Sequence, residues 1–178
     1  IELRERLAIS ADDAPGILKE VSARLASQEA LLVATCNRVE LYAVVSRPEE
    51  EAIARGVFAD RAPSLPDLHL YEHKDREAVR HLFRVTSSLD SMVVGEAQIA
   101  GQIKNAYGMA SAAGTAGSMF HRLMHRAFRV AKRVRTETSI GVGSVSVGSI
   151  AADLASQIFE SLHNRLVVLV GAGEMAEQ

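Results

Sequence analysis

Apolar residues recur along most of this chain at the spacing of an α-helix. Between Ala14 and Leu25 they lie three or four residues apart, and Asp13 and Pro15 provide a typical helix start. We expect Asp75 to cap a later helix. The same periodicity, with its start and stop signals, predicts helices over residues 49–60, 75–88, 96–113 and 118–137, and from about residue 144 to 162.

Shorter apolar segments predict strands. Leu31-Leu32-Val33 indicates one strand, and residues 39–45, where apolar side chains alternate with others, indicate a second. Residues 68–71 predict a third strand. The continuous apolar run at residues 166–170 is typical of a parallel strand that is buried on both faces of its sheet.

A glycine-rich turn follows that apolar run. Residues 171–176 have the sequence Gly-Ala-Gly-Glu-Met-Ala, which fits the pattern G-x-G-x-x-A directly after a predicted strand. In that context the glycines let a dinucleotide pyrophosphate approach the backbone at a helix N-terminus. The alternative is an ordinary glycine turn after a buried strand.

These patterns together predict the fold class. We expect an α+β domain over residues 1–138, and a linking segment with a helix over residues 139–163. Residues 164–178 would then be the first strand and turn of a Rossmann-type α/β domain, which is incomplete in this chain.

Composition and charge narrow the class of protein. Of 178 residues, 48% are hydrophobic and 24% charged, and the net charge of -2 marks neither a nucleic-acid binder nor a membrane binder. No apolar run reaches about 18 residues, so we expect no transmembrane helix, and no signal peptide is evident. Because the chain begins at Ile1, we expect its natural start to lie upstream. A single cysteine excludes an internal disulfide or a multi-cysteine zinc site and fits a reducing compartment.

That single cysteine, Cys36, is a candidate nucleophile. It lies between the first two predicted strands, and the cation of Arg38 would favour its thiolate form. Thr35 and Asn37 offer polar groups that could hold a carbonyl oxygen or its oxyanion. A lone cysteine is also often a small buried apolar residue, and spacing alone leaves both interpretations open.

Histidines offer two further hypotheses. His121 and His125 lie one turn apart on a predicted helix and could share a metal ion, but no third ligand is evident and packed or solvated histidines are favoured. His81 lies beside the apolar stripe of the helix at 75–88. If that helix faces Cys36, His81 could donate or accept a proton.

Arginines form a stripe on the helix at 118–137. They are spaced so that they share one helix face. Such a stripe is usually a solvated surface, but it could also meet phosphates. The residues are Arg122, Arg126, Arg129 and Arg133.

Several blocks of residues occur in a specific order and span nearly the whole chain. Residues 35–42 have the sequence Thr-Cys-Asn-Arg-Val-Glu-Leu-Tyr. A second group comprises the block at 81–85, the block Ser-Leu-Asp-Ser-Met-Val-Val-Gly-Glu-Ala-Gln-Ile at 88–99, and the block at 101–104. Residues 143–147 and the turn at 171–175 follow. In this combination the sequence resembles the glutamyl-tRNA reductase family.

The resemblance implies a domain organisation and a reaction. Members of the family have an α+β catalytic domain, an NADPH-binding Rossmann domain and a helical dimerisation domain. They reduce glutamyl-tRNA to glutamate-1-semialdehyde through a cysteine thioester, the first step of five-carbon tetrapyrrole (porphyrin) biosynthesis. The resemblance thus implies a cytoplasmic oxidoreductase that uses NADPH (an NADP enzyme) and forms a homodimer in full length. Glutamate-1-semialdehyde aminomutase is a further expected partner, and no membrane is involved.

The resemblance also assigns roles to residues. Cys36 would be the nucleophile and His81 a second catalytic residue; no metal is implied. Arg38 is a candidate for bidentate binding of the glutamate carboxylate. The substrate-binding positions would be Thr35, Asn37, Arg38, Ser91, Glu96, Ala97, Gln98 and Gln102. NADPH would be bound by Gly171, Ala172, Gly173, Glu174, Met175 and Ala176.

Two departures and two alternatives accompany the resemblance. The family often has proline where Ala97 stands, and we expect that a family strand that would precede Ile1 is missing from this chain. One alternative is a truncated, non-catalytic homologue that binds tRNA or a partner. The other is an unrelated cysteine hydrolase, which would need a base fixed by a carboxylate near Cys36. We expect this chain alone to accept glutamate on Cys36 but not to complete the reduction.

Overall fold

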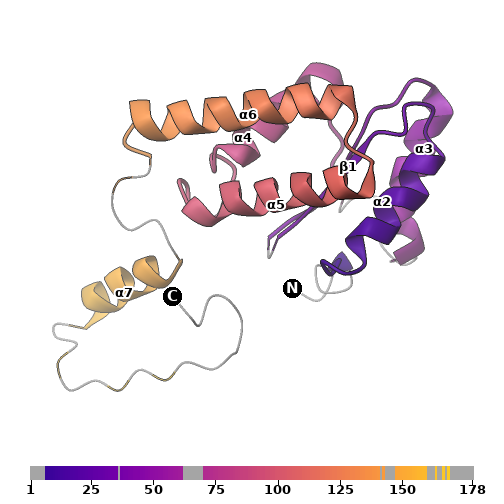
Figure 1. Cartoon of the computed structure of the whole chain (residues 1–178). Helices are drawn as coiled ribbons and strands as arrows, with labels where there is room; N and C mark the ends of the chain where they lie inside the picture. Colours follow the sequence, from indigo (N-terminus) through magenta and orange to yellow (C-terminus); the bar gives the residue numbers. More distant parts are fainter. Residues whose placement is uncertain are drawn as a thin grey trace.

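The structure, a computed structural model, describes residues 7–35, 37–61, 70–140, 142, 147–159, 163, 166 and 168. Two strands and six helices are arranged along these residues, with α7 standing apart from the other elements (Figure 1). The elements are α2 (Ala14–Ala23), β1 (Ala30–Ala34), β2 (Val39–Ala43), α3 (Pro48–Arg61), α4 (Asp75–Thr86), α5 (Ala97–Ala113), α6 (Ser118–Glu137) and α7 (Val147–Ile158).

The two strands form an antiparallel hairpin. Ala30 pairs with Ala43 and Ala34 with Val39, which leaves residues 35–38 as the connecting loop. Leu31, Leu32 and Val33 are almost completely buried, because helices cover β1. The hairpin therefore places Thr35 and Arg38, at the connection between the strands, at the end of a strand that is fixed in the core.

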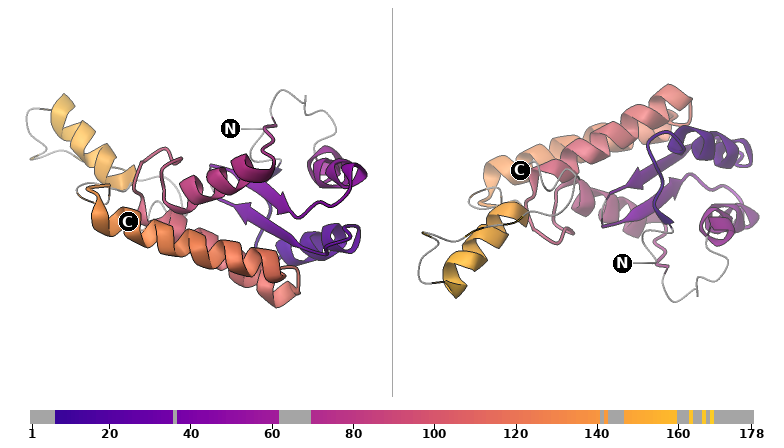
Figure 2. Two further views of the ribbon diagram at one scale, coloured as in Figure 1. Left: turned by 90° about the horizontal axis from the view of Figure 1, so that it is seen from above. Right: turned by 90° about the horizontal axis from the view of Figure 1, so that it is seen from below.

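Helices surround this hairpin in two groups. α5 and α2 pack on β1, α3 packs on α2, and α4 contacts both α5 and α6. Figure 2 shows α5 and α6 side by side along one flank, with the strands between them and the α2–α3 pair. The core joins Leu18 of α2, Leu82 of α4, Ile103 of α5 and Met124 of α6, all of which are inaccessible to solvent.

The α5–α6 turn is tied to the hairpin by one carboxylate. Gly114 adopts a left-handed conformation with φ of 76°, which ends α5 without steric strain. The Glu29 carboxylate then accepts hydrogen bonds from the backbone N–H groups of Met119 (3.2 Å) and Phe120 (3.0 Å). Because the N-terminal N–H groups of a helix have no partners within it, this contact caps α6 and fixes its direction.

Most of the predicted elements are confirmed. The helix at 118–137 has the predicted bounds, and the other predicted helices are present with ends that differ by a few residues. One detail is wrong: Lys74 is in the N-cap position and Asp75 is the first helical residue. The strand predicted at residues 68–71 is not present at Leu70 and Tyr71, and its first two positions lie outside the described residues.

The predicted Rossmann strand is not confirmed. Of the apolar run at 166–170, the structure describes Leu166 and Val168, which lie in no strand and are 89% and 70% exposed. A parallel strand gains its hydrogen bonds and its burial from neighbouring strands, and the described sheet consists of β1 and β2 alone. The glycine turn at 171–176 lies outside the described residues.

Glu50 joins three segments beside the core. Its carboxylate accepts hydrogen bonds from the backbone N–H groups of Ala26 (2.8 Å) and Ser46 (2.7 Å), and from the side chain of Arg47. The Glu50 side chain is 0% exposed. The backbone donors at Ser46 and Ala26, with Arg47, lower the pKa of Glu50 to about 2.

We expect Glu50 to govern part of the acid stability. A carboxyl whose pKa is lowered by folding stabilises the protein above its ordinary pKa and loses that contribution as the pH falls. The loss should therefore occur between about pH 4.5 and about pH 2. Urea unfolding across this range should show a shallower pH dependence for Glu50→Gln than for the wild type. An equal slope in Glu50→Gln would contradict the assignment, and Glu49→Gln, on the exposed side of α3, is the matched control.

Candidate active site

A buried carboxylate, Glu40 on β2, organises the candidate site. Its side chain is 5% exposed and is bonded by four donors from three segments. The Arg38 guanidinium donates to Oε1 over 2.8 Å, and the Tyr71 hydroxyl donates to the same oxygen. The Tyr42 hydroxyl donates to Oε2, and His81 Nε2 lies 2.9 Å from Oε1. A buried charge requires such partners, so Glu40 holds these four side chains in place.

The four donors keep Glu40 ionised. Burial alone would raise the pKa of Glu40, but hydrogen bonds from Tyr42, Tyr71 and His81 outweigh burial and lower it. Burial and the adjacent Glu40 charge raise the pKa values of Tyr42 and Tyr71, so both hydroxyls stay protonated as donors. The network is therefore one negative charge surrounded by hydrogen-bond donors.

Glu40 also fixes the orientation of His81 on α4. An ionised carboxylate only accepts hydrogen bonds, so Nε2 of His81 carries the proton and Nδ1 is the ring nitrogen that can accept one. The ring is 13% exposed and packs against His73 and Tyr71, with centroid distances of 4.7 and 5.5 Å. His81 is therefore held by a carboxylate in the way that a catalytic imidazole is oriented.

Arg38 bridges β2 and the loop after α4. Besides Glu40, its guanidinium contacts Asp90 through the backbone oxygen and through Oδ2 at 3.2 and 3.3 Å. Burial would lower the pKa of Arg38, but Glu40 and Asp90 more than offset it and raise the pKa. Asp90 is also 3.5 Å from Arg84. The predicted bidentate contact of Arg38 with a substrate carboxylate therefore requires Asp90, which is 37% exposed, to give way.

The loop at residues 35–38 is closed by Thr35. Its N–H donates to the carbonyl of Arg38 (2.8 Å), and its hydroxyl oxygen accepts from the N–H groups of Asn37 and Arg38, both at 3.2 Å. Cys36 itself lies outside the described residues. Its neighbours nonetheless lie at the end of the hairpin where Arg38 enters the Glu40 network.

The loop between α4 and α5 carries Ser91 and Glu96. Ser88 adopts a left-handed φ of 57° and its hydroxyl donates to the carbonyl of Glu96 over 2.7 Å, which closes the loop. Gly95 has a φ of 91°, and a Cβ there would lie 1.8 Å from the carbonyl oxygen of Ile140. Only glycine fits this position, so the loop is held firmly beside the end of α6.

Two predicted substrate-binding side chains have unused polar atoms. Ser91 Oγ and Gln102 Oε1 are buried and have no hydrogen-bond partner among the described residues, and Ser87 Oγ shares this property. Leaving a buried polar atom unpaired costs about 1–3 kcal/mol, so such atoms need an explanation. A polar ligand that bonds to them is one explanation, and Ser87 is a position that sequence reasoning did not single out.

The remaining predicted positions lie at the start of α5. Glu96 is its N-cap residue, and Gln98 and Gln102 are half-buried one turn apart, so they share a face of the helix. The side chain of Ala97 lies outside the described residues. α5 packs on β1, the strand that leads into Thr35.

Sequence reasoning gave no role to Glu40, Tyr71 or Asp90. Glu40 had a usable signal, since an acidic residue within an otherwise apolar strand needs a partner when it is buried. For Tyr71 and Asp90 the sequence gives no such signal, because their contacts with Glu40 and Arg38 span 31 and 52 residues of sequence.

The histidine pair on α6 is engaged with an aromatic residue of α5. The hydroxyl of Tyr107 lies 2.6 Å from Nδ1 of His121, and the rings of His125 and Phe128 also pack on Tyr107. Within the part of the chain that the structure describes, no three His, Cys, Asp or Glu side chains are placed to hold a metal ion. None of the described helices has the length and apolarity needed to cross a membrane.

Comparison with known proteins agrees with the fold and with the motifs. Residues 1–138 match the family described as "Glutamyl-tRNAGlu reductase, N-terminal domain". Glutamyl-tRNA reductase 2 of Anaeromyxobacter dehalogenans is 54% identical over 175 residues, which cover 98% of this chain and 38% of that protein. Glutamyl-tRNA reductase of Syntrophotalea carbinolica is 46% identical over 183 residues, covering 99% and 41%.

A solved structure is also similar. The glutamyl-tRNA reductase from Methanopyrus kandleri superimposes with a TM-score of 0.66 at 39% identity, over 98% of this chain and 41% of that one. The chain thus spans about two fifths of the length of these relatives. With a family match over most of its residues and an α+β structure like that of a solved member, the chain belongs to the glutamyl-tRNA reductase family.

Proposed function

We propose that the protein containing this chain reduces glutamyl-tRNA to glutamate-1-semialdehyde with NADPH, through a thioester on Cys36. The observation that carries the proposal is the network in which Glu40 joins Arg38, two residues after Cys36, to His81 on α4. The product would enter tetrapyrrole biosynthesis. This chain supplies the part that accepts the glutamyl group.

The proposed first step is an acyl transfer. The Cys36 thiolate attacks the carbonyl carbon of the aminoacyl ester, a C–S bond forms, and the bond from that carbon to the ribose oxygen breaks. His81 takes the proton of the Cys36 thiol at Nδ1 and returns it to the departing ribose oxygen, and glutamate remains as a thioester. Arg38, fixed by Glu40, supplies a positive charge that favours the thiolate. His81, with Nε2 on Glu40, exchanges protons at Nδ1.

Polar side chains of the two loops and of α5 would hold the glutamyl group. The unpartnered Ser91 Oγ and Gln102 Oε1 offer hydrogen bonds to its amino and carboxyl groups. Arg38 binds the carboxylate when Asp90 moves away. Thr35, Asn37, Glu96 and Gln98 line the same region, with Ala97 between the last two.

NADPH, bound at residues 171–176, would supply the hydride that converts the thioester to the aldehyde. Those residues lie outside the described part of the chain, so their assignment rests on the G-x-G-x-x-A motif. The division into a catalytic domain over residues 1–138, a linker over 139–163 and a cofactor domain from 164 is part of the proposal. We further propose that the full-length protein is a cytoplasmic homodimer that contacts glutamate-1-semialdehyde aminomutase.

The proposal is tested with the full-length protein, glutamyl-tRNA and NADPH. We expect equal amounts of NADPH oxidised, aldehyde formed and uncharged tRNA released. Binding of tRNA without turnover would instead identify a non-catalytic homologue. Release of free glutamate with no NADPH oxidised would identify a hydrolase, and either result would overturn the proposed function.

A further inference from the structure

The outward face of α6 concentrates positive charge in a protein whose net charge is -2. Arg122, Arg126, Arg129 and Arg133 recur at intervals of four, three and four residues and are all exposed. At a rise of about 1.5 Å per residue they form a stripe of roughly 16 Å. We call these four residues the basic face. In the sequence of α6, Glu137 is the sole acidic residue.

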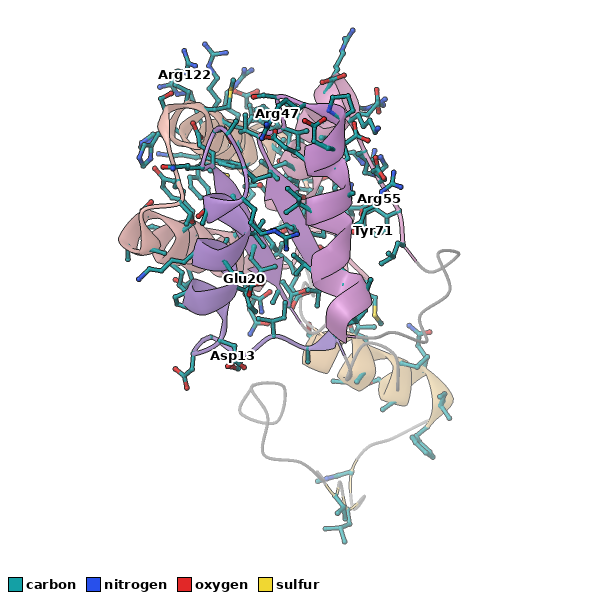
Figure 3. All side chains as sticks on the ribbon, turned by 90° about the vertical axis from the view of Figure 1, so that its right-hand side faces the viewer. Asp13, Glu20, Arg47, Arg55, Tyr71 and Arg122 are labelled. Atoms are coloured by element: carbon teal, nitrogen blue, oxygen red, sulfur yellow. The ribbon has the colours of Figure 1, made fainter. Side chains whose placement is uncertain are left out.

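The basic face points away from the core. Phe120, Met124, Ala127 and Ala131 are buried against the rest of the fold and lie on the opposite side of the helix. In Figure 3, Arg122 lies at the outer edge of the molecule, on the helix that forms the top of Figure 1. The four guanidinium groups are therefore accessible along one continuous surface.

Three of the four arginines lack an acidic partner among the described residues, whereas several exposed cations elsewhere have one. Arg133 pairs with Glu137, whereas Arg122, Arg126 and Arg129 make no ion pair with any described residue. By contrast Arg47, Arg55 and Lys74, which are just as exposed, are each paired with carboxylates. Like charges one turn apart destabilise a helix. Repulsion among the unpaired arginines therefore destabilises α6, and an anionic ligand would offset that repulsion.

The surface of α6 is also hollowed within the basic face. Met119, Arg122, Leu123 and Arg126 line a depression of about 200 Å³, with Met119 and Leu123 as its apolar part. An apolar surface bordered by guanidinium groups suits an unstacked nucleobase, because arginine stacks on bases and also bonds phosphates. A depression of this kind favours RNA over a ligand that offers charge alone.

We propose that the basic face of α6 binds the sugar–phosphate backbone of the tRNA part of the substrate, with a base or ribose beside the depression at Met119 and Leu123. This inference rests on the proposed function, which provides a tRNA substrate. Sequence-independent phosphate contacts of this kind position a nucleic acid and supply affinity without reading its sequence. The basic face would therefore orient the tRNA while its acylated end reaches the loop at residues 35–38.

The test compares two full-length variants with the same change in charge. In the first, Arg122, Arg126 and Arg129 are replaced by Gln. In the control, three exposed cations outside α6 that have no ion pair among the described residues, Lys19, Arg24 and Arg76, are replaced by Gln. The affinity for uncharged tRNA is measured by filter binding across a series of salt concentrations, and transfer of glutamate to wild-type protein is measured in parallel.

We expect the α6 variant to bind tRNA at least about tenfold more weakly. The slope of log K against log salt should fall by about 2 to 3, since each lost phosphate contact removes about 0.7–0.9. The control should keep the wild-type slope. An unchanged slope in the α6 variant, or an equal loss in the control, would overturn the inference. The proposed function is judged separately, whatever the result for the variants. It stands if the wild-type protein accepts glutamate, and it is wrong if the wild-type protein does not.

Discussion

Replacement of Cys36 by Ala in the full-length protein should abolish the covalent glutamyl-enzyme. It should also lower the rate of aldehyde formation by about 10⁴-fold or more, the scale on which removal of a nucleophile acts. The reason is that attack on the ester requires a thiolate, and Cys36 is the only cysteine of the chain. The rate is measured as aldehyde formed per enzyme under saturating glutamyl-tRNA and NADPH.

The control for this prediction is Cys36→Ser. A hydroxyl is a much poorer nucleophile than a thiolate at neutral pH, so this variant should be almost as inactive although it differs by one atom. The affinity of both variants for uncharged tRNA should remain close to that of the wild type, which separates loss of chemistry from loss of folding. Aldehyde formation by Cys36→Ala at more than one hundredth of the wild-type rate would exclude Cys36 as the nucleophile.

Replacement of Glu40 by Gln should have the second largest effect, on stability and on activity together. The amide has no charge to balance Arg38, and its NH₂ group would face donors that now bond a carboxylate. Breaking a buried ion pair costs about 3–5 kcal/mol, and the retained shape of Gln should keep the loss in unfolding free energy near the lower end. Displacement of Arg38 and His81 should lower the rate of thioester formation by about 100-fold.

Glu72→Gln is the matched control for this change. Glu72 pairs with Arg55 and Lys74 but is 39% exposed, so its loss should change the free energy of unfolding by less than about 1 kcal/mol.

The pH dependence of the stability provides a second check on Glu40. Folding lowers the pKa of Glu40, so its contribution is present above about pH 4.5 and is lost as the pH falls below it. In urea unfolding, the free energies of unfolding of the wild type and of Glu40→Gln should therefore become more alike as the pH falls. A difference between wild type and Glu40→Gln that stays constant down to pH 3 would contradict this account.

The helices could be predicted from sequence because their signals are local. Apolar periodicity and the glycines at 114 and 117 determine α5 and α6, and the predicted and observed bounds of α6 agree. The strand predicted at 166–170 is not confirmed at Leu166 and Val168. An apolar run does not show whether the neighbouring strands that would bury a parallel strand are present. The N-cap of α4 was predicted one residue too late, because the sequence indicates where a helix begins only to within one or two residues.

The candidate site was predicted in part. The block at residues 35–42 pointed to Cys36 and Arg38, and His81 does share a buried carboxylate with Arg38. That carboxylate, Glu40, was not predicted, because alternation along β2 locates a strand without showing which residues are buried by distant segments. The hydrogen bond from Arg38 to Asp90 could not be predicted either, since it depends on how the loop after α4 folds beside Arg38.

The most direct test of the central claim is the location of the glutamyl group on the protein. Full-length protein is mixed with glutamyl-tRNA labelled in the glutamate, without NADPH, quenched in acid and digested, and the peptides are analysed by mass spectrometry. We predict that the label is bound to Cys36 as a thioester that hydroxylamine removes. Label on any other residue, or release of glutamate from the tRNA with no covalent label on the protein, would contradict the account.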